Sequence, residues 1–215
     1  MNIFRFAGDM SHLLSIVVLL LKIRATRSCR GISLKTQELY ALVFVCRYLD
    51  LFYSYISLYN TVMKIIYLVT AFWILYLMRM DMVVKQTYDK DMDTFRYVFL
   101  IGPCLILAFL IHYSSSFTEI LWTFSIYLES VAIFPQLVLM QRTQNIDNLT
   151  GNYVFLLGLY RGLYILNWIY RYYTEPNYRQ WLVWISGIVQ TALYADFFYY
   201  YIDCWKSNKR LQLPA

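Results

Sequence analysis

Long apolar stretches alternate with short polar segments along the whole chain. A helix needs about 20 mostly apolar residues to cross a bilayer. Seven stretches approach that length, at 3–22, 37–58, 61–79, 97–113, 118–140, 153–173 and 180–203. The boundary between the second and third is the weakest, because only Leu58 to Asn60 separates them and Asn60 is the turn residue there. The pattern predicts an all-α membrane protein with seven transmembrane helices.

The composition agrees with a membrane as the solvent. Of the 215 residues, 60% are hydrophobic, 20% aromatic and 15% charged, which gives more apolar surface than one soluble domain could bury. Basic residues, rather than a small-residue cleavage site, follow the first stretch. We therefore expect this stretch to remain in the mature protein and not to be a cleaved signal peptide.

Basic residues gather in two segments, the first loop and the C-terminal tail. They are Lys22, Arg24, Arg27, Arg30 and Lys35 in the loop, and Lys206, Lys209 and Arg210 in the tail. The positive-inside rule makes both segments cytosolic. Six spans would put the two termini on one side, whereas an odd number with a lumenal N-terminus fits the charges. The sequence predicts a lumenal N-terminus and a cytosolic C-terminus.

A weak internal repeat relates the two halves of the chain. A shift of 114 residues places Thr36 over Thr150, Leu42 over Leu156 and Arg47 over Arg161. A chance match between hydrophobic helices would look much the same. Taken as a repeat, it predicts a single domain, 1–215, whose parts are a three-helix unit at 3–80, a linker helix at 97–113, a second three-helix unit at 118–203 and a tail at 204–215. With the Pro135–Gln136 pair in the fifth stretch, this layout resembles that of the PQ-loop and SWEET group, and membrane proteins with parallel repeats have ligand sites between the two halves.

Several charged residues interrupt the apolar stretches away from their ends. They are Arg47, Asp50, Glu119, Glu129, Arg161, Arg171 and Asp196, with Arg5 and His12 in the first stretch. A charge at the centre of a spanning helix costs about 2.5 to 3.5 kcal/mol, so together they cannot face lipid. We expect them to face the interior, whereas Lys64 lies near enough to a helix end to reach the interface.

Helical spacing puts these charges on common faces. Residues Tyr160, Arg161, Tyr164, Asn167, Trp168 and Arg171 fall in one arc, as do Glu119, Trp122, Ile126 and Glu129. Arg47 and Asp50 are three residues apart and would share a face of the second helix. Structural ion pairs would explain any single pair, but the number of ionisable residues favours a binding cavity.

The residue types suggest what such a cavity would bind. Arginine binds carboxylates through two parallel hydrogen bonds, so arginines at several depths with acids beside them suit a ligand with several carboxylates and one cation. A short acidic peptide end has that character, and a sugar fits less well. No catalytic motif or metal-ligand cluster is evident, and we expect no enzyme activity, cofactor, metal or nucleic-acid partner. His12 is either a hydrogen-bonded core residue or a group whose protonation favours anion binding at lower pH.

Several motifs resemble those of the KDEL receptor family, the ER lumen protein-retaining receptors, over the whole chain. They are "MNIFR", "GDMSHL", "RSCRGIS", "RYLDLF", "ISLYN", "EILWTFSIYLESVAIFPQL", "GLYRGLYILNWIYR" and "LQLPA". The loop "NIDNLTGNY" and the tyrosine-rich stretches are more similar to plant members. The resemblance implies a receptor that binds C-terminal KDEL or HDEL signals of soluble ER proteins in the acidic Golgi and releases them in the ER.

The resemblance also implies roles for single residues. Arg47 would bind the terminal carboxylate, and Arg5 and Arg171 the acidic side chains of the signal. Asp50, Glu119 and Trp122 would receive its cationic first residue, and Arg161, Tyr164, Asn167 and Trp168 would complete the wall. His12 would sense pH, with a Tyr160–Glu129 hydrogen bond locking the bound state, and Asp196 would couple binding to conformational change.

The C-terminal tail carries the remaining expectations. Lys206 and Lys209 are candidates for recognition by the retrograde vesicle coat, although anchoring on the cytosolic side explains them equally well. Gln212 stands where some relatives have a phosphorylatable serine, which argues against that form of control. The competing hypothesis is a sugar or amino-acid transporter with the same helix arrangement.

Overall fold

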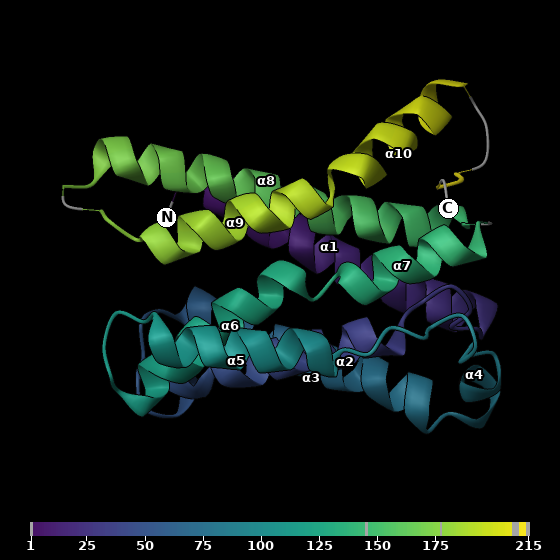
Figure 1. Cartoon of the computed structure of the whole chain (residues 1–215), viewed down its shortest axis with the longest axis horizontal. Coiled ribbons are helices and arrows are strands. Elements are labelled where there is room, and N and C mark those ends of the chain that lie inside the picture. Colours follow the sequence, from purple (N-terminus) through teal and green to yellow (C-terminus); the bar gives the residue numbers. More distant parts are fainter. Residues whose placement is uncertain (1, 145, 177, 208–210, 214–215) are drawn as a thin grey trace.

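The computed structural model describes residues 2–144, 146–176, 178–207 and 211–213, and these residues form helices and loops without a β-strand. The helices are α1 (Ile3–Thr26), α2 (Leu34–Arg47), η1 (Leu49–Phe52, a 3-10 helix), α3 (Leu58–Arg79), α4 (Met82–Gln86), α5 (Val98–Leu110), α6 (Phe117–Val131), α7 (Phe134–Thr143), α8 (Asn148–Thr174), α9 (Trp181–Leu193) and α10 (Ala195–Ser207). The long helices run roughly along one axis (Figure 1). The all-α prediction is therefore confirmed for the described residues.

The helices form a bundle in which sequence-distant helices pack side by side. The most extensive contact is between α1 and α8, and α2 packs against both α3 and α6. On the other side, α6 also contacts α5 and α9. The shift of 114 residues places α1 on α6 and α2 on α8. Under this shift, the contact between α1 and α8 corresponds to the contact between α6 and α2.

Side chains at the helix starts explain why several helices begin where they do. The Asn2 side chain accepts a hydrogen bond from the backbone N–H of Arg5 at the start of α1. Ser33, Ser57 and Asp147 accept in the same way at the starts of α2, α3 and α8. Such caps satisfy N–H groups that have no partner within the helix.

The structure corrects the predicted second span. Its helix ends at Arg47, and η1 and an irregular segment carry the chain to the start of α3 at Leu58. The apolar pattern continues past Arg47, so periodicity alone could not find this end. The Asp50 side chain is instead bound by Lys64 of α3, and Ser57 starts a new helix.

Two other predicted spans contain a break. The fifth divides into α6 and α7 just before Pro135, which lacks a backbone N–H and so interrupts the helical hydrogen bonds. The seventh bends by 43° between α9 and α10, so α10 diverges from the bundle (Figure 1).

The lengths and apolar character of the helices fit a membrane protein. Three segments of the described chain are long and apolar enough to cross a bilayer: Ile3–Thr26, Leu58–Arg79 and Phe117–Thr143. The bent pair α9–α10 makes a fourth if it is one span, while α5 is apolar but shorter. Helix α8 has 27 residues and is polar along one face. The count of seven stays a prediction.

A charged cavity among the helices

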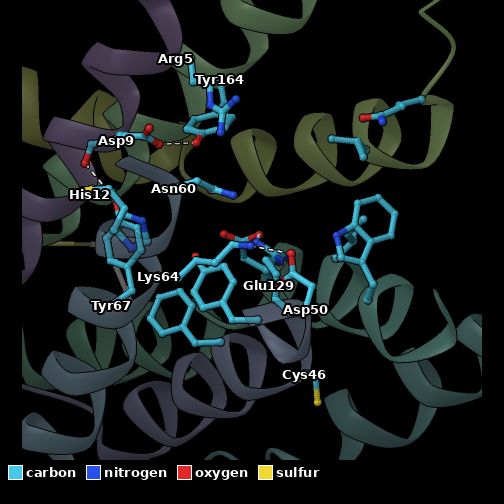
Figure 2. Close-up of a pocket in the computed structure, with 18 of the residues that line it drawn as sticks. Arg5, Asp9, His12, Cys46, Asp50, Asn60, Lys64, Tyr67, Glu129 and Tyr164 are labelled. Atoms are coloured by element: carbon cyan, nitrogen blue, oxygen red, sulfur yellow. Dashed lines mark hydrogen bonds and ion pairs between the residues drawn. The ribbon is translucent and has the colours of Figure 1, made fainter. Parts of the chain in front are cut away.

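A cavity of about 820 Å³ opens near the end of the bundle where α1, α3 and α6 begin and α8 ends. The cavity is lined by residues that the sequence singled out: Arg5, His12, Arg47, Asp50, Glu119, Trp122, Glu129, Tyr160, Arg161, Tyr164, Asn167, Trp168 and Arg171. Figure 2 shows how side chains from several helices converge there.

Glu129 lies at the base of the cavity, where it is 2% exposed and joins α2, α6 and α8. Its carboxylate accepts a hydrogen bond from the Tyr160 hydroxyl at 2.5 Å. It also pairs with the Arg47 guanidinium at 2.5 Å and with that of Arg161 at 3.3 Å. One carboxylate thus binds two arginines and a tyrosine.

Both arginines keep unused donors beside Glu129. Arg47 donates through Nε to the Ser125 hydroxyl at 3.1 Å. Within the described residues, Nη2 of Arg47 and Nε of Arg161 are buried and have no hydrogen-bond partner. A buried donor without a partner is costly, so an acceptor that reached these atoms would stabilise the site.

The expectation that Arg47 and Asp50 share one face of the second helix is wrong. Arg47 is the last residue of α2 and reaches Glu129, whereas Asp50 lies in η1 and pairs with Lys64 at 2.5 Å. The expectation that Lys64 reaches the interface is also wrong, because this residue is only 9% exposed. The change from α-helix to 3-10 helix after Arg47 separates the two side chains.

The His12 ring is held among aromatic rings. It stacks on Tyr160 with 4.3 Å between ring centroids and an angle of 9°, and on Tyr67 at 4.7 Å. Phe44 lies at 5.8 Å on a tilted plane. Tyr160 also binds Glu129, so this one tyrosine contacts both the His12 ring and the Glu129 carboxylate.

Asp9 is a cavity residue that the sequence reasoning missed. It is 7% exposed, and its carboxylate accepts hydrogen bonds from the hydroxyls of Tyr59, at 2.8 Å, and Tyr164 (Figure 2). Its backbone carbonyl accepts from Tyr67 at 3.1 Å. The signal was available, since Asp9 lies in the first apolar stretch between Arg5 and His12.

The remaining predicted residues also line the cavity. The Arg171 guanidinium pairs with Glu175 at 2.7 Å and lies 4.3 Å from the centre of the Tyr178 ring. The Arg161 guanidinium lies 5.5 Å from the Trp168 ring, and Asn167 accepts from the Asn2 amide at 2.8 Å. In the described part of the chain, neither Arg5 nor Glu119 has an ion-pair partner.

Polar side chains also connect the helices at the end of the bundle opposite the cavity. Lys22 of α1 is 2% exposed and binds Asp147 and Thr150 at the start of α8. Burial alone would raise the pKa of the Asp147 carboxyl, but hydrogen bonds from Lys22 and Thr150 hold it below its ordinary value. Gln136 is fully buried and binds the start of α2: its side-chain oxygen accepts from the backbone N–H of Ser33 at 2.8 Å, and its own backbone N–H donates to the Thr36 hydroxyl at 3.0 Å.

These two contacts are related by the same shift of 114 residues. It places Lys22 over Gln136 and also aligns Thr36 with Thr150. In each half, a buried polar side chain therefore binds the start of a helix from the other half.

The residues predicted to act outside the cavity are placed as follows. Asp196 is exposed on α10 and is not among the residues that line the cavity. Lys206 is exposed near the end of α10, while Lys209 lies outside the described residues. Leu211 and Leu213 are buried. Among the described residues, no three His, Cys, Asp or Glu side chains are grouped so that they could hold a metal ion.

The fold and the site define a helical membrane protein with a charged, aromatic-lined cavity near one end. The family model for the ER lumen protein retaining receptor matches residues 28–171. ER lumen protein-retaining receptors from Petunia hybrida and Arabidopsis thaliana (receptor B) are 63% and 65% identical to this chain, and human receptor 2 is 55% identical. Each comparison covers all of both chains. This chain belongs to the ER lumen protein retaining receptor family.

Proposed function

We propose that this protein captures soluble ER proteins by a C-terminal Lys-Asp-Glu-Leu or His-Asp-Glu-Leu signal in the Golgi and returns them to the ER in retrograde vesicles. The observation that supports this proposal most directly is the charge of the side chains that line the cavity. Its lining has six basic side chains, Arg5, Arg47, Lys64, Arg161, Arg171 and Arg179, and four acidic ones, Asp9, Asp50, Glu119 and Glu129.

The charge of the signal complements that of the cavity. With His12 neutral, the lining has an excess of two positive charges. A Lys-Asp-Glu-Leu end has one cation, two acidic side chains and a terminal carboxylate, and so an excess of two negative charges near neutral pH. A neutral sugar would leave the excess charge of the cavity uncompensated.

Several contacts support the role of each arginine. The Arg47 side chain is 19% exposed, and a small shift of its guanidinium would let Nη2, which is buried and without a hydrogen-bond partner among the described residues, bind the terminal carboxylate. Arg5 is free of acidic partners within the described chain and can bind an acidic side chain of the signal. Arg171 would have to leave Glu175, at the surface, to do the same.

The opposite side of the cavity suits the cationic first residue. Glu119 is an acid without an ion-pair partner in the described chain, and Trp122 on the same helix offers an aromatic face. Asp50 adds a second carboxylate. The buried Arg161, Asn167 and Trp168, with Tyr164, complete the wall.

Protonation of His12 gives the proposed receptor its pH dependence. A protonated His12 adds a positive charge to a cavity that binds an anion, so ligand binding and proton binding favour each other. The groups near His12 include Tyr160 and Tyr67, which stack on it, and Glu129 with its two arginines. The bond from Tyr160 to Glu129 would hold the bound conformation.

We also propose seven spans, in two three-helix units joined by α5, with a lumenal N-terminus and a cytosolic C-terminus. Two observations support the division into two units. The α1–α8 contact corresponds to the α6–α2 contact under the shift of 114 residues, and so does the contact of Lys22 to that of Gln136. Asp196 would couple ligand binding to movement of α10, and Lys206 and Lys209 would be recognised by the vesicle coat.

The experiment that tests this function compares two ligands on the purified protein at about pH 6. A peptide ending in His-Asp-Glu-Leu with a free carboxylate should bind, and the same peptide with an amidated C-terminus should bind at least about tenfold more weakly, as expected when a charged hydrogen bond is lost. Equal binding of the two peptides, or no binding of either, would overturn the proposal.

A further inference from the structure

The outward surface of α1 and α3 carries an arginine stacked on a tryptophan ring, away from the cavity. We propose that Arg24 and Trp73 form a binding site for the headgroup of an anionic phospholipid, whose acyl chains lie along the apolar faces of the two helices. The site concerns the lipid-facing surface of the bundle, so it goes beyond the proposed function and does not depend on it.

The contact joins two helices that are each long and apolar enough to cross a bilayer. Arg24 is in the last turn of α1, and Trp73 is in the second half of α3. The Arg24 guanidinium lies 5.5 Å from the centre of the Trp73 ring, within the range of a cation–π interaction. Trp73 also stacks on Tyr76, with 5.6 Å between ring centroids. Arginine, tryptophan and tyrosine are the side chains that favour the boundary between headgroups and hydrocarbon.

The Arg24 guanidinium is available to a ligand. Its residue is exposed, and it takes part in none of the ion pairs of the described chain. Stacking on Trp73 uses the face of the planar guanidinium, whereas its N–H donors lie in the plane. Those donors can bind a phosphate through two parallel hydrogen bonds while the stack remains.

Apolar side chains lead from this contact along both helices. At helical spacing, exposed apolar residues share the face of Arg24 on α1 and the face of Trp73 on α3. They are Leu14, Val17 and Leu21 on α1, and Ile65, Val69 and Phe72 on α3. In a bilayer these side chains face hydrocarbon, so the acyl chains of a lipid held at Arg24 would lie against them.

The charges around Arg24 favour an anionic headgroup over a zwitterionic one. The segment 24–30 contains Arg24, Arg27 and Arg30, all exposed, and no acidic residue. Asp147, an acid that contacts this end of α1, is paired with Lys22. The positive charge of this surface would repel the ammonium of phosphatidylcholine, whereas it complements the net negative charge of phosphatidylserine.

The stack distinguishes a site at Arg24 from the general positive charge of a loop at the membrane surface. The cation–π contacts of the described residues include Arg24 but neither Arg27 nor Arg30. A general attraction would depend equally on the three arginines and would not depend on Trp73. A site requires Arg24 and Trp73 together.

The test measures lipid binding to the full-length protein purified in detergent, by native mass spectrometry and by the rise in Tm with each probe. The probes are phosphatidylserine and phosphatidylcholine with the same acyl chains, and inorganic phosphate. The variants are Arg24→Gln, Arg24→Lys and Trp73→Leu. Arg27→Gln is the matched control, because it removes the same charge from the same segment and leaves the Trp73 contact in place. The Tm without a probe shows whether each variant is folded.

The expected result depends on both the lipid and the variant. The wild-type protein should bind phosphatidylserine at least about fivefold more tightly than phosphatidylcholine, and Arg24→Gln should lose about that factor. Trp73→Leu should weaken phosphatidylserine binding about threefold, and Arg27→Gln less than about twofold. Arg24→Lys should fall between wild type and Arg24→Gln, since lysine keeps the charge but not the planar group.

Three results would overturn the inference. Equal losses in Arg24→Gln and Arg27→Gln would assign lipid binding to the summed charge of the segment. Equal affinity of the wild type for the two lipids would exclude an anionic headgroup. An equal rise in Tm with inorganic phosphate would show that the acyl chains take no part. If Arg24→Gln does not fold, Trp73→Leu against Arg27→Gln gives the same comparison, and none of these results changes the peptide binding that tests the proposed function.

Discussion

The guanidinium of Arg47 and the carboxylate of Glu129 lie 2.5 Å apart at the base of the cavity, with side chains 19% and 3% exposed. This contact joins the end of α2 to the last turn of α6. Arg161 of α8 binds the same carboxylate. Glu129 therefore stabilises the packing of three helices and also sets the charge that a ligand meets.

Removing the charge of Glu129 should destabilise the protein. Glu129→Gln leaves two buried arginines without an acid, and breaking a buried pair in this way typically costs about 3 to 5 kcal/mol. Thermal unfolding in detergent should show a clearly lower Tm. Glu38→Gln is the matched control, because Glu38 pairs with the exposed Arg79 and a surface pair contributes only about 0 to 1 kcal/mol. Equal Tm values for the two variants would contradict the proposed role of Glu129.

Removing Arg47 should strongly weaken peptide binding without unfolding the protein. In Arg47→Ala, Glu129 keeps Arg161 and Tyr160 as partners. The lost contact with the terminal carboxylate should reduce affinity by roughly 100-fold, in line with truncation of a buried charge pair. Arg47→Lys should not restore it, since an ammonium cannot bind a carboxylate as a guanidinium does. Wild-type affinity in Arg47→Ala would rule out the carboxylate assignment.

Replacing His12 should remove the pH dependence of binding. His12→Phe keeps a ring that can stack on Tyr160 and Tyr67 but cannot take up a proton. The variant should bind the signal with similar, weak affinity at about pH 6 and about pH 7.4, on either side of the ordinary histidine range. His112→Phe is the control, since His112 does not line the cavity. A normal pH profile in His12→Phe would assign the switch to another group.

Two glycines offer a matched test of how Trp168 is positioned. A Cβ at Gly187 would lie 2.3 Å from the Trp168 ring, whereas one at Gly162 would meet no atom within 4 Å. Gly187→Ala should displace Trp168 from the cavity wall, cost about 1 to 3 kcal/mol of stability and weaken peptide binding. Gly162→Ala should leave both unchanged or raise stability, because alanine is favoured over glycine in a helix. Tm values and peptide titration of both variants measure the difference.

Hydrophobic pattern and charge placement were sufficient to locate the long helices and most of the charged residues of the cavity. The arc on α8 from Tyr160 to Arg171 was read correctly because one regular helix carries it. Periodicity fails where a helix ends inside an apolar stretch. This is why the separation of Arg47 from Asp50, and the burial of Lys64, could not be predicted.

Asp9 shows a different limit of prediction from the sequence. Its carboxylate is bound by tyrosines from α3 and α8, and no spacing within α1 indicates those partners. Similarly, the break before Pro135 was visible in the sequence as a proline, but the buried contacts of Gln136 depend on the start of α2, which is 100 or more residues away.

The most direct test of the whole account is the affinity of the purified protein for a His-Asp-Glu-Leu peptide at about pH 6 and about pH 7.4, which bracket the ordinary histidine range. The account predicts tight binding at the lower pH and at least about tenfold weaker binding at the higher pH, equivalent to about 1.4 kcal/mol. Equal affinity at the two pH values, or tighter binding at pH 7.4, would contradict it.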